Sequence, residues 1–156
     1  MGSGGSSAAP VYLLDTCVLV AYVRAGALGK HVEQTYSLMS QPFKPLICEV
    51  TVGEILALAR RLGWGEAKTS LMEALLRNLV RVDISDRALM GAYADLDCYA
   101  VDNGIGIGKN DLWIASAARV TDALLLTTDK GFKPLLAAGL IRGEWIDPAV
   151  VRGGGH

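Results

Sequence analysis

The sequence predicts a single α/β domain in which a mostly parallel sheet is covered by helices. Short apolar runs, typical of buried strands, alternate along the chain with longer segments whose apolar residues recur at helical spacing. Alternating strands and helices form βαβ units, and such units build parallel sheets. A length of 156 residues with 51% apolar residues suits one domain with a substantial core.

The first half of the chain predicts strands and helices bounded by turn residues. Pro42 and Pro45 bracket a turn before the second apolar run, and Gly63 and Gly65 stop a strong helical pattern. The expected elements are, in order, a strand over 11–14, helices over 16–23 and 28–39, a strand over 46–48, and helices over 52–62 and 66–78.

The second half repeats this alternation. A helix that begins near Ser85 is broken by the run Gly104-Ile-Gly-Ile-Gly108. The stretch before that run is helical, whereas a dinucleotide-binding loop follows a strand, so we interpret the glycines as a connecting loop. The expected elements are, in order, a strand over 79–84, helices over 85–101 and 110–119, a strand over 123–127, a short helix over 132–138 and a strand over 144–146.

The two ends of the chain are expected to lie outside the fold. Residues 1–10 are predicted to be a flexible arm or a remnant of cloning, residues 11–148 the domain, and residues 149–156 a flexible tail. The start lacks the basic and apolar regions of a secretion signal. No apolar stretch reaches the roughly 18 residues that span a bilayer. We therefore expect a cytoplasmic protein without a membrane segment.

Composition excludes several classes of function. The net charge of −1 means that any contact with nucleic acid must be local, because proteins that bind it by bulk charge are basic. Cys17, Cys48 and Cys98 form no C-x-x-C pair and are expected to be buried free thiols, which argues against a disulfide scaffold or zinc site. Two histidines, one of them terminal, leave little scope for histidine acid–base catalysis.

Four acids occupy equivalent places in the predicted elements. Asp15 and Asp129 follow apolar strand-like runs, whereas Glu54 and Asp111 lie at the starts of helical patterns. In parallel α/β sheets the ligand site lies beyond the carboxyl ends of the strands, so these acids can converge there. Clustered carboxylates bind divalent cations, and a bound cation can support phosphodiester hydrolysis.

Each acid also has a purely structural interpretation. Thr51-x-x-Glu54 has the form of a capping box, Asp15 and Asp129 can cap helices, and Asp111 beside Asn110 can be a first-turn acid. Taken singly, capping is the commoner role of such residues. Four such acids in partly apolar surroundings are harder to explain this way, because unpaired buried charge is costly and a shared cation removes the cost.

The remaining motifs are weaker. The run Asp15-Thr-Cys lacks the second aspartate of a phosphotransfer D-x-D pair, which disfavours an aspartyl-phosphate enzyme. Arg60-Arg61 is usually a solvated helix end, and its less common role is a phosphate contact near Glu54. The three tryptophans are expected in the core or at an interface rather than as base-stacking platforms; they are Trp64, Trp113 and Trp145.

In this order and at these separations, the acidic motifs resemble those of PIN-domain ribonucleases, and most closely the toxins of VapBC toxin–antitoxin pairs. The motifs are Leu14-Asp15-Thr-Cys-Val-Leu, Thr51-x-x-Glu54, Asn110-Asp111-x-x-Ile-Ala-Ser-Ala and Thr127-x-Asp129-x-x-Phe132. The resemblance runs from about Val11 to Ile146. It implies a three-layer α/β/α fold with a central, mostly parallel sheet, dependence on Mg²⁺ or Mn²⁺, and endonucleolytic cleavage of RNA.

By carry-over, the resemblance also implies roles for particular residues. Asp15, Glu54, Asp111 and Asp129 would be the catalytic acids, with Asp15 and Asp111 as metal ligands. Thr16, Thr127 and Asn110 would support them. The implied partners are an RNA substrate, an antitoxin with a basic tail and a second copy of the chain.

One position departs from the family pattern. Many relatives carry a further acid two residues after the fourth, where this chain has Gly131, so one metal position can be weaker or empty. Two alternatives stay open beside the toxin. One is a stand-alone PIN nuclease, because such nucleases share the same motifs and a toxin is defined by its gene context. The other is a metal-free α/β adaptor that only docks a partner, which the departure at Gly131 favours.

Overall fold

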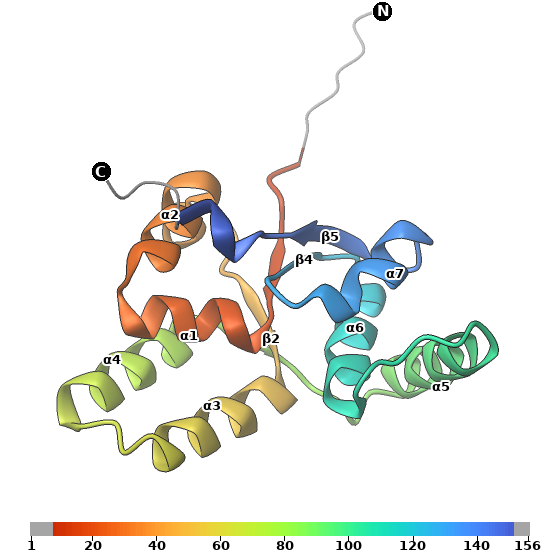
Figure 1. Ribbon diagram of the computed structural model, residues 1–156, viewed down its shortest axis with the longest axis horizontal. Helices are drawn as coiled ribbons and strands as arrows, with labels where there is room; N and C mark the ends of the chain where they lie inside the picture. Colours follow the sequence, from red (N-terminus) through yellow and green to blue (C-terminus); the bar gives the residue numbers. More distant parts are fainter. Residues whose placement is uncertain (1–7, 152–156) are drawn as a thin grey trace, which may run out of the picture.

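The structure is a computed structural model that describes residues 8–151, so the expectations for 1–7 and 152–156 lie outside the described residues. A five-stranded parallel sheet lies between two layers of helices, which confirms the predicted fold class (Figure 1). The strands are β1 (Tyr12–Leu14), β2 (Leu46–Cys48), β3 (Val80–Val82), β4 (Leu124–Thr127) and β5 (Arg142–Trp145). The α-helices are α1 (Thr16–Arg24), α2 (Ala27–Tyr36), α3 (Glu49–Arg61), α4 (Glu66–Arg77), α5 (Arg87–Asp102), α6 (Lys109–Thr121) and α7 (Lys133–Ala137). The 3₁₀-helices are η1 (Leu38–Ser40), η2 (Lys130–Phe132) and η3 (Pro148–Val151), of which the last crosses the predicted boundary at residue 148.

The order in which successive strands are added to the sheet reverses at its centre, although all strands stay parallel. The order is β3-β2-β1-β4-β5, so the chain moves outward from β1 on one side and returns to the other side with β4. β1 and β4 are hydrogen-bonded parallel neighbours, with Leu14 opposite Leu126. Open parallel sheets bind ligands beyond the strand ends at such a switch point. The residues that follow β1 and β4 are therefore the first place to look for a site.

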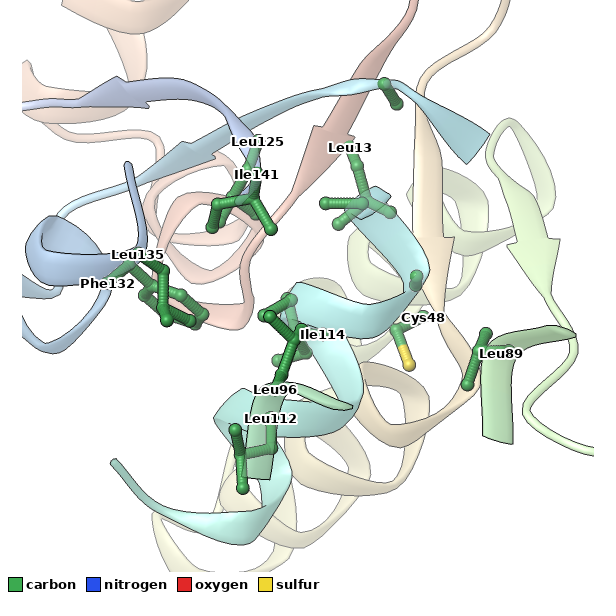
Figure 2. Packing of buried hydrophobic residues seen from close by; sticks show 14 residues of the cluster. Leu13, Cys48, Leu89, Leu96, Leu112, Ile114, Leu125, Phe132, Leu135 and Ile141 are labelled. Carbon is green, nitrogen blue, oxygen red and sulfur yellow. The ribbon is translucent and has the colours of Figure 1, made fainter. Parts of the chain in front are cut away.

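Two apolar cores cover the two faces of the sheet. Alternate strand residues point to opposite faces, so Leu13 and Leu125 belong to one core and Leu14 and Leu126 to the other. The first core packs the sheet against α5, α6 and α7, and Figure 2 shows its buried side chains. The second packs it against α1 to α4. The two helical layers thus hold the central strands in place below the edge of the sheet where their carboxyl ends lie.

Helix α6 is buried through its middle turns. Ile114–Ala118 are consecutive buried residues, mostly alanine and serine, and their small side chains suit a helix enclosed by its neighbours. The Ser116 hydroxyl is satisfied by the carbonyl of Leu112, so its burial leaves no unpaired polar atom. This packing holds the amino end of α6, which carries Asn110 and Asp111, beside the strand ends.

Several predicted boundaries were displaced. The helix expected over 28–39 ends at Tyr36, because Ser37 adopts a left-handed conformation with φ of 51° and a short 3₁₀-helix follows. The last strand begins earlier than expected, at Arg142. Gly143 permits this pairing: its φ is 155°, and a Cβ there would lie 2.1 Å from the carbonyl oxygen of Leu125. Close β4–β5 pairing places Trp145 opposite Thr127.

The environments of the cysteines and tryptophans partly differ from expectation. All three cysteines are free, but only Cys48 is buried; Cys17 is half-buried and Cys98 is exposed on the outer side of α5. The prediction of three buried thiols was therefore wrong for Cys98, which the helical period places away from the core. All three tryptophans are partly exposed, but Trp64 and Trp113 pack against the two cores, as predicted. Within residues 8–151, no helix is long and apolar enough to cross a membrane.

Candidate active site

Asp15 is a buried carboxylate at the carboxyl end of β1, with only 4% of its surface exposed. It is the N-cap of α1, as the capping interpretation predicted, and its Oδ1 accepts a hydrogen bond of 2.8 Å from the Thr16 backbone N–H. Its Oδ2 accepts bonds from Thr127 Oγ1 at 2.7 Å and from Cys17 Sγ at 3.2 Å. Burial raises the pKa of Asp15, these donors oppose the rise, and the charge of Glu54 adds to it.

Thr127 connects Asp15 to Asp129. It is the last residue of β4 and fully buried, and its hydroxyl oxygen accepts a 2.9 Å bond from the Asp129 backbone N–H while its proton goes to Asp15. Asp129 is the N-cap of η2, where its Oδ1 accepts a 2.8 Å bond from the Gly131 N–H. Thr127 thus links Asp15 and Asp129, the two residues that were predicted to be N-caps.

Glu54 does not form the predicted capping box. Helix α3 begins at Glu49 with Cys48 as an N-cap that makes no side-chain bond, so the buried Thr51 lies inside the helix. The Glu54 Oε1 instead accepts a 2.7 Å bond from Thr16 Oγ1, which also lies 3.2 Å from Thr51 Oγ1. The earlier helix start turns both side chains toward α1. Asn110 Nδ2 donates a longer bond of 3.5 Å to Glu54 Oε2.

Asp111 interacts electrostatically with each of the other three acids, and we call the four together the acid cluster. It is the first-turn acid of α6 and half-buried, and its pKa is raised to about 7. The causes are burial first, then the charges of Asp15, Asp129 and Glu54, together with the adjacent carboxyl of Asp129. All four predicted acids therefore lie at one edge of the sheet. In the described part of the chain the one ion pair, Arg142–Asp122, lies elsewhere, so no basic side chain neutralises them.

The donor chemistry of this acid cluster fits a hard divalent cation. Oxygen atoms such as those of carboxylates are the ligands such ions prefer, and a cation would offset both the burial and the neighbouring negative charges that raise the pKa of Asp111. The fit is not ready-made: among residues 8–151, no group of three or more acidic, histidine or cysteine side chains is already placed to hold an ion. Binding would require the carboxylates to draw together.

A groove of about 560 Å³ leads away from the acid cluster along α3. Its α3 residues recur at helical spacing and form one face of the helix, with small side chains in the middle and Arg61 at the far end. Asn110 of α6 adds to the near end beside Glu54. The lining residues are Val50, Gly53, Glu54, Ala57, Arg61 and Asn110. An extended ligand that reached the acids could lie in this groove.

Three residues of the site were missed by sequence reasoning. Cys17 was interpreted only as a free thiol, but it donates to Asp15 and accepts a 3.3 Å bond from the Thr128 N–H. Its position two residues after Asp15 was an available signal. Thr51 was assigned to a cap. Trp145 donates from Nε1 to the Thr128 carbonyl at 3.0 Å, and no local pattern could reveal this because it depends on β4–β5 pairing.

Comparisons with known proteins agree with this geometry. The PIN domain family model matches residues 12–135. The structure is similar to VapBC2 from Rickettsia felis, solved bound to a promoter DNA fragment, with a TM-score of 0.72 and 22% identity over 88% of this chain and 99% of that one. It is also similar to VapBC-5 from Mycobacterium tuberculosis, with a TM-score of 0.62 and 21% identity over 88% of this chain and 100% of that one. VapBC-1 from nontypeable Haemophilus influenzae gives a TM-score of 0.63 and 21% identity over 86% and 97%. No curated protein sequence matches the chain. At these identities the structural likeness is one of fold.

Proposed function

This chain belongs to the PIN-domain family of nucleases, and from that premise we propose that it is a Mg²⁺- or Mn²⁺-dependent endoribonuclease. The observation that carries the proposal is the environment of Asp111. Its pKa is raised by burial and by three neighbouring carboxylates, and within residues 8–151 no basic side chain forms an ion pair with any of the four acids. Such an arrangement is electrostatically unfavourable without a cation and is therefore typical of a functional site rather than of helix capping.

Asp15 and Asp111 are the proposed metal ligands, and Glu54 and Asp129 complete the catalytic acids. When bound, the ion would neutralise charge on the phosphoryl group and activate a water for in-line attack. The residues around the acids orient them: Thr127 and the Thr16 N–H hold Asp15, and Thr16 Oγ1 holds Glu54. Asn110 supports Glu54 from α6. No histidine or serine nucleophile is needed.

The substrate is proposed to be RNA that enters along the α3 groove. This groove begins at Glu54 and Asn110, and Arg61 at its far end can contact a backbone phosphate. With a net charge of −1 over the whole chain, such contacts are local rather than the result of a broadly basic surface.

We further propose that the protein is a cytoplasmic homodimeric toxin neutralised by an antitoxin with a basic tail. Several structurally similar proteins are VapBC complexes. The four carboxylates create a region of negative electrostatic potential, and a guanidinium pairs with a carboxylate through two hydrogen bonds. An arginine in the tail of a partner would neutralise the acids in place of the ion.

A metal-free adaptor is the second candidate, and two observations favour it. Within the described residues the acids form no preformed ligand group, and Gly131 stands where many relatives have an acid. Melting in the presence of Mn²⁺ separates the two candidates. A rise in melting temperature that disappears in the Asp15→Asn variant supports the nuclease, whereas indifference to Mn²⁺ supports the adaptor.

The direct test is cleavage of RNA by the wild type and by Asp15→Asn with Mg²⁺, with Mn²⁺ and with EDTA. We expect internal cleavage by the wild type with either ion, and none with EDTA or with the variant. Asp95→Asn, which removes an exposed acid on α5, is the matched control and should cleave normally. An active Asp15→Asn variant would reject the proposed site.

The toxin assignment has a separate test. The chain is co-expressed with the product of the neighbouring upstream reading frame. We expect the two products to purify together and cleavage to be suppressed. If no product with a basic tail does this and the chain still cleaves RNA, a stand-alone PIN nuclease is the correct description.

A further inference from the structure

We propose that Trp145, together with Lys130 and Lys133, binds an unpaired nucleotide of the substrate beside the cleaved bond. The indole ring would stack on the base, and the two ammonium groups would contact a phosphate. This inference rests on the proposed endoribonuclease function and adds the residues that would hold the nucleotide next to the cleaved bond. It also replaces the expectation that Trp145 only fills a core or an interface.

The indole of Trp145 is fixed next to the acid cluster. β5 pairs with β4 so that Trp145 lies opposite Thr127, and the indole Nε1 donates to the Thr128 carbonyl at 3.0 Å. Thr128 lies between Thr127, which binds Asp15, and Asp129. In Figure 1 the carboxyl end of β5 lies beside that of β4. A base on this ring would therefore neighbour the phosphate held at the acids.

The ammonium groups of two lysines lie over the indole ring of Trp145. Lys133 Nζ is 3.8 Å from the ring centroid and Lys130 Nζ is 5.9 Å from it, and both side chains are exposed on the segment that follows Asp129. The ring itself is partly exposed. Neither lysine forms an ion pair with the acids, since the one ion pair of residues 8–151 joins Arg142 to Asp122. Both positive charges are thus available to a phosphate.

The chemistry of this group matches a splayed-out nucleotide. Aromatic rings stack on bases that are not already paired in a duplex, which makes such platforms selective for single strands. Lysines on flexible stems can turn from the ring to a phosphate, because an exposed cation–π contact is weak. Phosphate binding here would also offset the repulsion between RNA and the four carboxylates.

The chain contains a matched control for this arrangement. Lys68 Nζ lies 5.5 Å from the ring centroid of Trp64, so the same residue types form the same kind of pair there. Trp64 lines a different groove, with Arg60 and Met72, between α3 and α4. It follows the carboxyl end of α3, and that helix ends at Arg61, about 10 Å in helical rise from Glu54. A general effect of removing a tryptophan would appear at both positions.

The experiment measures binding of a short single-stranded RNA oligonucleotide to Asp15→Asn protein, in which cleavage is blocked. Adding Trp145→Leu should weaken binding about tenfold or more, whereas Trp64→Leu should leave it unchanged. Trp145→Phe should retain most of the affinity, because it keeps an aromatic ring. This variant removes the bond to Thr128 and so tests stacking separately from that bond. Changing Lys130 and Lys133 together to Gln should lower the salt dependence of binding by roughly 0.7 for each phosphate that the lysines would otherwise neutralise.

The results separate this inference from the proposed function. If the otherwise wild-type chain cleaves RNA and Trp145→Leu binds and cleaves normally, the nuclease stands and the stacking interaction is rejected. If Trp145→Phe is as weak as Trp145→Leu, the role of Trp145 is to hold Thr128, and the inference is also rejected. Equal effects on single-stranded and duplex RNA would overturn it as well. If the wild type neither binds nor cleaves RNA, both proposals fail.

Discussion

The acid cluster has two halves that are held in different ways. On the sheet side, Asp15 is buried and accepts hydrogen bonds from three donors, each on a strand end or on the first turn of α1. On the helix side, Glu54 and Asp111 are partly exposed, and the bond from Asn110 to Glu54 is 3.5 Å long. One half is fixed by the fold, while the other can still move.

This difference explains why the acids are clustered without yet forming a ligand group. Carboxylates that repel one another separate wherever their side chains are free to do so, and here that freedom belongs to the helix side. The Asp15 carboxylate cannot relax, because it is buried and accepts a hydrogen bond from the fully buried Thr127, whose hydroxyl also accepts one from the Asp129 backbone N–H. We therefore expect a cation to bind to a rigid Asp15 and to draw Asp111 toward it.

The largest expected effect is from removing the fixed charge. Asp15→Asn should lower cleavage by at least about a hundredfold, because stabilisation of the phosphoryl group by a metal ion is worth several kcal/mol. The fold should be intact or slightly more stable in EDTA, since burial and Glu54 already disfavour the charge of Asp15. Steady-state kinetics and thermal melting measure both. A variant that cannot fold would show that Asp15 is mainly structural.

A paired substitution tests the comparison between the two halves. Thr127→Val removes the donor to Asp15 on the sheet side and should cost about 1–3 kcal/mol of stability, since it leaves buried partners unpaired. Thr16→Val removes the donor to Glu54 on the helix side. We expect cleavage to fall about tenfold in the first variant and only a few-fold in the second. The reverse order would contradict the assignment of a fixed and a mobile half.

The raised pKa of Asp111 predicts how stability depends on pH. Its folded value of about 7 lies above the ordinary 3.8, so the folded protein keeps a proton that the unfolded chain releases between these values. Without metal, stability should therefore fall as pH rises through this window and level off above it, by on the order of 1 kcal/mol after allowance for solvent screening. Denaturant unfolding in EDTA at several pH values measures this.

The same carboxyl predicts the effect of metal. Binding of Mn²⁺ should strengthen as pH rises toward 7, since the ion and the proton compete for Asp111. In Asp111→Asn, the fall in stability with pH should become smaller and Mn²⁺ should no longer raise the melting temperature. An unchanged pH profile in this variant would place the raised pKa on another residue.

The smallest expected effect is at the end of the α3 groove. Arg61→Ala should weaken RNA binding a few-fold and reduce its salt dependence by roughly one phosphate contact, with little effect on the rate at saturation. Arg60→Ala is the matched control, because its side chain lines the groove on the α4 side. Equal effects of the two substitutions would mean that only the overall charge matters.

The sequence by itself determined the layers and the acids. Apolar runs and helical periods are local properties, so each predicted strand has a counterpart in the sheet, with boundaries displaced by a few residues. Asp15, Asp111 and Asp129 could be found because each lies at a strand end or helix start, and a parallel topology brings such positions to one edge. Glu54 was found through its motif, although α3 begins at Glu49 and Glu54 therefore lies inside the helix. Caps and site residues are here the same residues, as Asp15 and Asp129 show.

Only the tertiary structure decided how these acids are held and what lies next to them. The partner of Glu54 is Thr16, 38 residues earlier, and not Thr51 of the apparent capping box. Cys17 meets Thr128 only because β1 pairs with β4, and Trp145 reaches Thr128 only because Gly143 allows β5 to pair closely with β4. Local sequence encodes a hydrogen-bond donor or a ring, but its partner is set by strand order, which depends on the packing of the whole chain.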